Sequence, residues 1–252
     1  MLPGLRVFKR FLIAFIAVGV VVVVVLYGTR YFQKPVPTPT PDPRDQLKAL
    51  QVLSVQVLPV SSSDYDVVAR IQNPNTDYGS GDVEYTLLFD TTEVYHGSLY
   101  ILPGQTKYIV ITPVKAAATP AQATIKITSI KWQELDTLSL AGVNFVVTNA
   151  SYLSNQSDIF ARLRGFVANN SDFDVARVDV AILLFDDKDK IVAVNRTEIH
   201  TFLAHTTRGF ETSWFTKFPG TVARTYVEAN TNLFAESGFI RTYGGQERFQ
   251  TF

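Results

Sequence analysis

The sequence predicts an all-β protein in which two tandem β-sandwich domains follow one N-terminal transmembrane helix. Three observations support this fold class. An uncharged apolar stretch runs from Phe11 to Gly28. Beyond it, short segments of alternating apolar and polar residues are separated by turns roughly every 8–12 residues, as in a β-sandwich. A pattern in the first half of the chain then recurs in the second half.

The stretch Phe11–Gly28 is long enough to cross the apolar core of a bilayer, because a helix of its 18 residues covers about 27 Å. Its valine run, Val20–Val25, is a poor helix former in water, but in lipid the backbone must satisfy its own hydrogen bonds and the helix forms regardless. A cleaved secretory signal is the alternative, although such a signal is shorter and ends in a small-x-small site, where this stretch has Leu26. We therefore expect residues 1–34 to hold a retained anchor.

Basic residues flank the apolar stretch unequally. Arg6, Lys9 and Arg10 precede it without an acidic residue, whereas Arg30 and Lys34 follow it. By the positive-inside rule, the N-terminus stays in the cytoplasm. The prediction is a single-pass protein of the cell membrane, with the lipid bilayer as one partner and the body of the chain outside the cytoplasm.

The neutral overall charge hides an asymmetry. The chain has 23 basic and 23 acidic residues, but five of the basic ones lie in the first 34 positions, so the remainder carries a formal charge of −5. This excess of acid argues against a nucleic-acid partner, which requires a basic face, and against a second, electrostatic attachment to anionic lipid. The absence of cysteine excludes disulfides and thiolate metal sites.

Proline occupies every second position from Pro35 to Pro43. Each proline fixes its own φ and disfavours helix at the preceding residue, so the segment favours extended polyproline II. We expect residues 35–45 to form a stiff stalk. An SH3-type ligand is the alternative, but no partner of that kind is expected outside the cytoplasm.

Residues 46–135 alternate in the manner of short strands, without helical periodicity of useful length. In one segment, Asp82, Glu84 and Thr86 alternate with an apolar row that we expect to face the core: Val83, Tyr85, Leu87 and Phe89. About seven segments of this kind predict the first β-sandwich.

The second half repeats landmarks of the first. Three pairs correspond: Val167–Asp186 with Ile71–Asp90 without a gap, Asn169 with Asn73, and Leu203–Thr207 with Leu102–Thr106. Such a recurrence indicates a tandem duplication. The second β-sandwich is predicted to span residues 143–252, after a linker at residues 136–142.

The gapless alignment contains one conflict. It equates Phe185 with Phe89, and Phe89 is a residue that we expect to face the core. Arg177 and Asp179 instead predict an inward row of the other parity: Val178, Val180, Ile182 and Leu184. Because a slip of one residue exchanges the two faces of a strand, either one copy contains a β-bulge or the alignment is wrong by one residue.

Three segments of the second half resemble the bacterial FxLYD domain, a relative of LEA-type β-sandwiches: Gly165–Ser171, Ile182–Asp186 and Ile191–Val194. The family motif Phe-x-Leu-Tyr-Asp would fall on Ile182, Leu184, Phe185 and Asp186, with two aromatic positions altered. The first half matches only through Thr86–Asp90. The resemblance implies immunoglobulin-like sandwiches in an envelope-associated protein, and it implies no catalytic residue.

Candidate metal ligands are sparse. His200 and His205 are close enough in sequence to suggest a metal pair, but His205 occupies the turn position of Gly104, and no third ligand has a matching spacing. The run Asp186–Asp189 lacks the glycine and the distant glutamate of a calcium loop and is typical of a polar hairpin turn. We predict no metal site.

No sequence motif marks a catalytic nucleophile, since there is neither a Gly-x-Ser-x-Gly pattern nor a cysteine. The segment Gly79–Gly81 is too short to cradle a phosphate, and no helix follows it. Four aromatic residues are expected in the cores rather than on a ligand platform: Trp132, Phe210, Trp214 and Tyr226. The sequence therefore predicts no catalytic or cofactor-binding residue and no cofactor.

These features favour a non-enzymatic, membrane-anchored envelope protein that presents its β-sandwiches for protein interaction, adhesion or assembly. A stiff spacer is useful when the domains must stand clear of the bilayer, and we expect a protein partner. The first alternative is a passive structural or stress-protective component of LEA-like type, which rests on analogy of fold alone. The second alternative is an enzyme whose site forms only in the folded chain.

Overall fold

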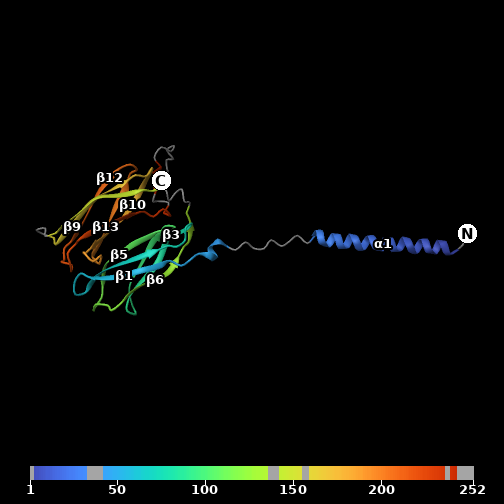
Figure 1. Cartoon of the computed structure of the whole chain (residues 1–252), viewed down its shortest axis with the longest axis horizontal. Helices are drawn as coiled ribbons and strands as arrows, with labels where there is room; N and C mark the ends of the chain where they lie inside the picture. Colours follow the sequence, from blue (N-terminus) through green and yellow to red (C-terminus); the bar gives the residue numbers. More distant parts are fainter. Residues whose placement is uncertain (1–2, 33–41, 136–141, 155–158, 236–238, 243–252) are drawn as a thin grey trace, which may run out of the picture. The chain divides into compact units, whose positions relative to one another are not determined.

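The computed structural model describes residues 3–32, 42–135, 142–154, 159–235 and 239–242 (Figure 1). The chain divides into two compact units, Met1–Asp45 and Gln46–Phe252. Most of the predicted proline stalk and of the predicted linker lies outside the described residues, at 33–41 and 136–141.

The first unit contains helix α1, Pro3–Phe32. A proline suits the first turn of a helix, because the N–H that it lacks has no intrahelical partner there. The described side chains from Leu12 to Tyr27 are apolar or small, and all of them are exposed. No helix in the described part of the chain combines the length and the apolar character of a membrane span. A 3₁₀ helix, η1 (Pro43–Gln46), lies at the end of the predicted stalk.

The second unit consists of antiparallel strands. Residues 51–134 form two sheets that we call the first sheet pair. One sheet has the order β1-β2-β5, from β1 (Gln51–Pro59), β2 (Asp64–Gln72) and β5 (Thr106–Lys115). The other has the order β4-β3-β6 with β7 beside β3, from β3 (Tyr78–Phe89), β4 (Thr92–Ile101), β6 (Ala123–Ile130) and β7 (Gln133–Glu134).

The seven strands described between residues 145 and 242 form the second sheet pair. One sheet has the order β12-β9-β8, from β8 (Phe145–Ser154), β9 (Ala161–Asn169) and β12 (Thr207–Trp214). The other has the order β11-β10-β13 with β14 beside β10, from β10 (Phe173–Phe185), β11 (Ile191–Phe202), β13 (Arg224–Asn230) and β14 (Phe239–Thr242). The strand order of the first sheet pair is therefore repeated, with β8 to β14 in the places of β1 to β7.

Each sheet pair has its own hydrophobic core, to which both of its sheets contribute. In the first, Ile71 of β2 and Leu87 of β3 are fully buried in one cluster. In the second, Leu163 of β9 and Ile182 of β10 are fully buried in another. The prediction of an all-β body is confirmed, since the second unit consists of antiparallel sheets around these cores.

Two buried asparagines show where the second half departs from the gapless alignment. The side-chain amide of Asn73 donates to the carbonyl of Tyr78, five residues on, at 2.7 Å. The amide of Asn169 donates to the carbonyl of Phe173, four residues on, at 2.8 Å. The second loop is one residue shorter, so the gapless alignment is wrong by one residue after Asn169.

The two inward rows predicted from alternation are both confirmed. In β3 the row lies in the first core: Val83, Tyr85, Leu87 and Phe89. In β10 the row lies in the second core: Val178, Val180, Ile182 and Leu184. With the shorter loop, Leu184 rather than Phe185 takes the position of Phe89.

The other face of β10 packs against the first sheet pair. A third buried cluster, here called the junction cluster, draws on both pairs: Leu58, Val68 and Val110 from the first, and Leu183, Phe185 and Val194 from the second. Hydrogen bonds also cross between the pairs. Gln56 Nε2 donates to the carbonyl of Ile191 at 2.7 Å, and Gln105 Nε2 donates to Asn230 Oδ1 at 2.9 Å. β10 is thus buried on both faces.

Candidate binding site between the two sheet pairs

A cavity of about 250 Å³ lies between the sheet pairs, next to the junction cluster. The first pair contributes residues of β3, β4 and β5 to its lining, and the second pair contributes residues of β10, β11 and β13. Its polar lining includes Tyr100, Lys107, Arg177, Asp179 and Arg196. The cavity therefore brings together residues that are distant in the sequence.

Lys107 is a buried cation at this cavity. Strand alternation places it in the same inward row of β5 as Ile109 and Ile111, and its side chain is only 6% exposed. Its ammonium nitrogen donates to the backbone carbonyl of Tyr100 at 3.2 Å and lies 3.6 Å from the centre of the Tyr100 ring. An ammonium has three hydrogens to donate, so this bond and the cation–π contact leave donor capacity unused.

Burial lowers the pKa of Lys107 to about 8, because the charged form loses its hydration. The carboxylates of Asp179 and Glu228 oppose that change, and the guanidinium of Arg177 adds to it. In turn, burial raises the pKa of Glu228, whose carboxylate accepts bonds from Tyr226 Oη at 3.1 Å and Asn230 Nδ2 at 2.6 Å.

The phenol of Tyr100 is buried, and its oxygen has no hydrogen-bond partner among the described residues. Burial raises its pKa well above the ordinary value, and the negative charge of Asp179 raises it further. Asp179 acts on the pKa of this hydroxyl both through its charge and through a side-chain contact, although the geometry of the two groups does not make a regular hydrogen bond. A buried hydroxyl without a partner is costly, so this oxygen is suited to a molecule that enters the cavity.

The two arginines of the cavity are more exposed than Lys107. Arg177 uses its Nε to pair with Asp179 at 3.0 Å. Among the described residues, no hydrogen bond or ion pair engages the guanidinium of Arg196. Glu198, which also lines the cavity, lies 3.3 Å from His200 Nε2. The site has charges of both signs, but most of its unused hydrogen-bonding groups are donors.

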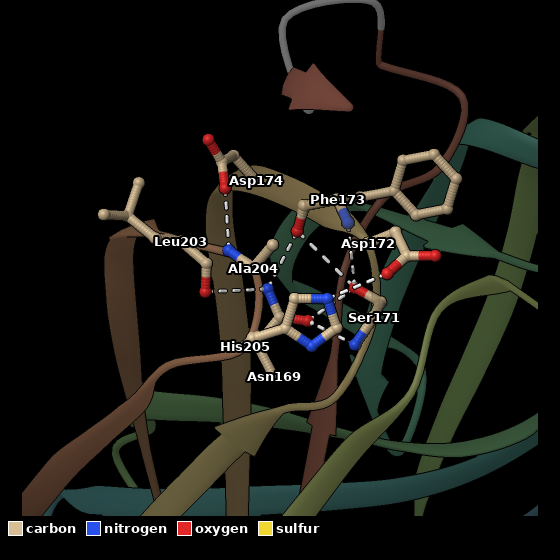
Figure 2. Close-up of polar contacts among 8 residues, drawn as sticks. All are labelled: Asn169, Ser171, Asp172, Phe173, Asp174, Leu203, Ala204 and His205. Carbon is tan, nitrogen blue, oxygen red and sulfur yellow. Dashed lines mark hydrogen bonds and ion pairs between the residues drawn. The ribbon is translucent and has the colours of Figure 1, made fainter. Parts of the chain in front are cut away.

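The histidines singled out from the sequence lie elsewhere. His205 follows β11 and pairs with Asp172 at 2.8 Å (Figure 2), whereas His200 lies on β11 beside Glu198. Within the described ranges, no three potential ligands of the His, Cys, Asp or Glu type are grouped in a way that could hold a metal ion.

His205 belongs to a corner built around Asn169 (Figure 2). The amide of Asn169 donates to the carbonyls of Phe173 and Leu203, and the Asn169 oxygen accepts the backbone N–H of Ser171 at 3.1 Å. His205 has a φ of 53°, and Gly104 in the first half has a φ of 64°. The two turns therefore correspond, as the sequence predicts.

The run Asp186–Asp189 forms the turn between β10 and β11, as predicted. The carboxylate of Asp186 accepts the backbone N–H groups of Lys188 and Lys190, both at 2.9 Å, and the bond from Lys190 is the main cause of its lowered pKa. Asp189 pairs with Arg224 at 2.9 Å.

Of the four aromatic residues that were predicted to lie in the cores, three do so and one does not. Phe210 and Trp214 are buried in the second core, and Trp132 packs partly buried against the first. Tyr226 is 37% exposed and makes an edge-to-face contact with Tyr108 across the junction. The expectation that Tyr226 is a core residue was wrong, because it points to the face of β13 that meets the other sheet pair.

The glycines of Gly79–Gly81 serve close packing. A Cβ on Gly79 would come within 2.8 Å of the Phe234 ring, and one on Gly81 would come within 2.7 Å of the same side chain. Asn232 Nδ2 also donates to the carbonyl of Gly81 at 3.2 Å. These glycines allow the end of the second sheet pair to approach β3 of the first.

Sequence reasoning did not identify Lys107 or Tyr100. A charged residue at the start of a strand ordinarily extends into solvent, and alternation with Ile109 and Ile111 was the only sequence signal for its inward position. Comparison with known families finds no family model that matches the chain, and no curated protein matches it.

Proposed function

We propose that this chain is a single-pass membrane protein that presents two immunoglobulin-like β-sandwiches outside the cytoplasm, where they act in protein interaction, adhesion or assembly without catalysing a reaction. The observation that carries the proposal is the exposed apolar surface of α1.

Every large apolar side chain described in α1, from Leu12 to Tyr27, is at least 48% exposed. Removing one such side chain from water is worth about 1.5–3 kcal/mol, so a helix that is apolar on all sides requires an apolar environment. A bilayer provides that environment along the uncharged stretch Phe11–Gly28. The basic residues Arg6, Lys9 and Arg10 favour a cytoplasmic N-terminus.

The repeated strand order and the core shared by the two sheets of each pair support the β-sandwich interpretation. The resemblance of Gly165–Ser171 and Ile182–Asp186 to the FxLYD domain supports an immunoglobulin-like fold in an envelope protein. The two domains in this proposal are residues 46–135 and 143–252, and the proline-rich residues 35–45 hold them away from the membrane.

Protease accessibility tests the topology. Protease added to intact spheroplasts is expected to degrade the chain beyond about Arg44 and to leave a membrane-embedded fragment that still begins at Met1. A body that stays protected until the membrane is broken would reverse the orientation and remove the basis for an envelope function.

Two substitutions test the anchor. Each lysine placed at the centre of a spanning helix costs roughly 2.5–3.5 kcal/mol of insertion free energy, so Val18→Lys with Val22→Lys is expected to shift the chain from the carbonate-washed membrane fraction to the soluble fraction. The matched control, Val18→Leu with Val22→Leu, keeps the apolar character and is expected to stay in the membrane. Equal retention of both variants would contradict the anchor.

A cross-linked pull-down of the full chain separates an interaction role from the passive LEA-like alternative. A stoichiometric partner that is lost when exposed residues of one sheet pair are substituted supports interaction. Recovery of the chain without any such partner favours the passive role.

A further inference from the structure

We propose that the cavity between the two sheet pairs is a binding site for a small organic molecule with one carboxylate group, held by Lys107 and Tyr100 at its buried end and by Arg177 and Arg196 at its exposed end. This inference does not depend on the membrane topology or on the interaction role proposed above.

The balance of donors and acceptors favours an acceptor-bearing ligand. Lys107 makes one hydrogen bond, to the Tyr100 carbonyl, and the Tyr100 hydroxyl makes none among the described residues. Arg177 pairs with Asp179 through Nε, and no hydrogen bond or ion pair from a described residue engages the Arg196 guanidinium. A carboxylate offers about four acceptor sites and no donor, which complements these unused N–H and O–H groups.

The charges of the lining restrict the ligand to a low charge. Lys107, Arg177 and Arg196 are opposed by Asp179 and Glu198 in the lining and by Glu228 near Lys107, so positive and negative groups are equal in number. A monoanion adds less uncompensated charge to such a balanced lining than a dianion such as phosphate would.

The rest of the lining favours an organic body. Leu99, Ile109 and Ala181 provide apolar surface, and Tyr85 and Tyr108 provide aromatic surface. A single water fits into a far smaller volume than about 250 Å³, so one bridging water would leave most of the cavity without a partner. A carboxylate with an apolar group of a few carbons matches both parts of the lining.

Calorimetric titration of the full chain in detergent tests the site. The probes are butyrate and benzoate, their neutral isosteres butyramide and benzamide, and inorganic phosphate. We expect saturable one-to-one binding of at least one carboxylate in the millimolar range or tighter, with the matching amide and phosphate at least tenfold weaker. No saturable binding of either carboxylate, or equal binding of the amide or of phosphate, would overturn the proposal.

Two variants locate the binding site. Tyr100→Phe removes only the unpaired hydroxyl and retains the ring, so the fold is preserved and carboxylate binding is expected to weaken about threefold to tenfold. Arg196→Gln changes an exposed residue and is expected to weaken binding by a similar factor. The controls Tyr152→Phe on β8 and Lys126→Met on β6 lie outside the lining and are expected to leave affinity unchanged. Binding that is unaltered in both cavity variants would place the ligand elsewhere.

Discussion

Burial and neighbouring carboxylates have opposite effects on the pKa of Lys107, and their net effect can be measured. Burial lowers its pKa from 10.5 to about 8, while Asp179 and Glu228 favour its charged form. The other charged or titratable groups around it are Tyr100 on β4 and Arg177 on β10. Burial also raises the pKa of Tyr100 well above its ordinary value.

Between pH 8 and 10.5 the unfolded chain keeps a proton on Lys107 that the folded chain has lost. The free energy of unfolding therefore rises with pH across this window, by about 3 kcal/mol from this residue, and the contribution is constant below it. Lys107→Met is expected to remove the rise, as measured by urea denaturation of wild type and variant at a series of pH values. The control Lys126→Met changes an exposed position and should show the same rise of the unfolding free energy with pH as the wild type. The same pH dependence in the wild type and in Lys107→Met would show that Lys107 is not the group responsible.

At the scale of single elements, the corner at the end of β9 depends on one amide. Asn169 is fully buried, and its nitrogen donates to the carbonyls of Phe173, Phe202 and Leu203. Asn169→Ala leaves these carbonyls without that donor and is expected to lower the free energy of unfolding by about 2–4 kcal/mol. The measurement is urea denaturation, with the exposed neighbour Asn170→Ala as a control that changes it by less than about 0.5 kcal/mol. Equal effects of the two substitutions would show that the amide is not essential to the corner.

The β10 strand shows how far sequence reasoning reaches. Alternation around Arg177 and Asp179 indicated the inward row that ends at Leu184, because a half-buried strand reveals its face through its polar residues, but the alignment of Phe185 with Phe89 left the register open. Beyond Val180 the strand is continuously apolar, which is typical of a strand buried on both faces. This apolar run is consistent with packing on the second face of β10, but alternation alone does not identify which strands cover that face.

The remaining parts of the structure depend on contacts between distant residues. The shorter loop after Asn169 changes the register by one residue, and a single gapless comparison does not reveal a deletion of that length. The cavity needs β4 and β5 of one sheet pair to face β10 and β13 of the other. Lys107 and Asp179 lie 72 positions apart in the sequence, and no local pattern relates them.

At the scale of the whole molecule, the junction cluster is expected to couple the two cores. Leu87 lies in the first core and Leu184 in the second, and both are fully buried. Replacing either with alanine is expected to cost about 2–5 kcal/mol. Because buried residues such as Leu183 and Phe185 join the pairs, each substitution should shift one common unfolding transition rather than one of two.

Phe185→Ala provides the contrasting case. It removes a ring from the junction cluster and leaves both inner cores intact, so it is expected to separate the common transition into two. Scanning calorimetry of the full chain in detergent can measure this for Leu87→Ala, Leu184→Ala and Phe185→Ala. Two independent transitions in the wild type, each responding only to the substitution in its own core, would show that the sheet pairs unfold separately.

The burial of Asn169 has a consequence for producing the protein in a foreign host. Asn169-Asn170-Ser171 is an acceptor sequence for N-linked glycosylation, yet the acceptor nitrogen is fully buried and bonded to backbone carbonyls. A glycan attached there during translocation into a eukaryotic secretory pathway would prevent the corner from closing. We expect chains modified at this position to be retained and degraded, while the secreted fraction carries an unmodified Asn169, as peptide mass spectrometry of the two pools would show.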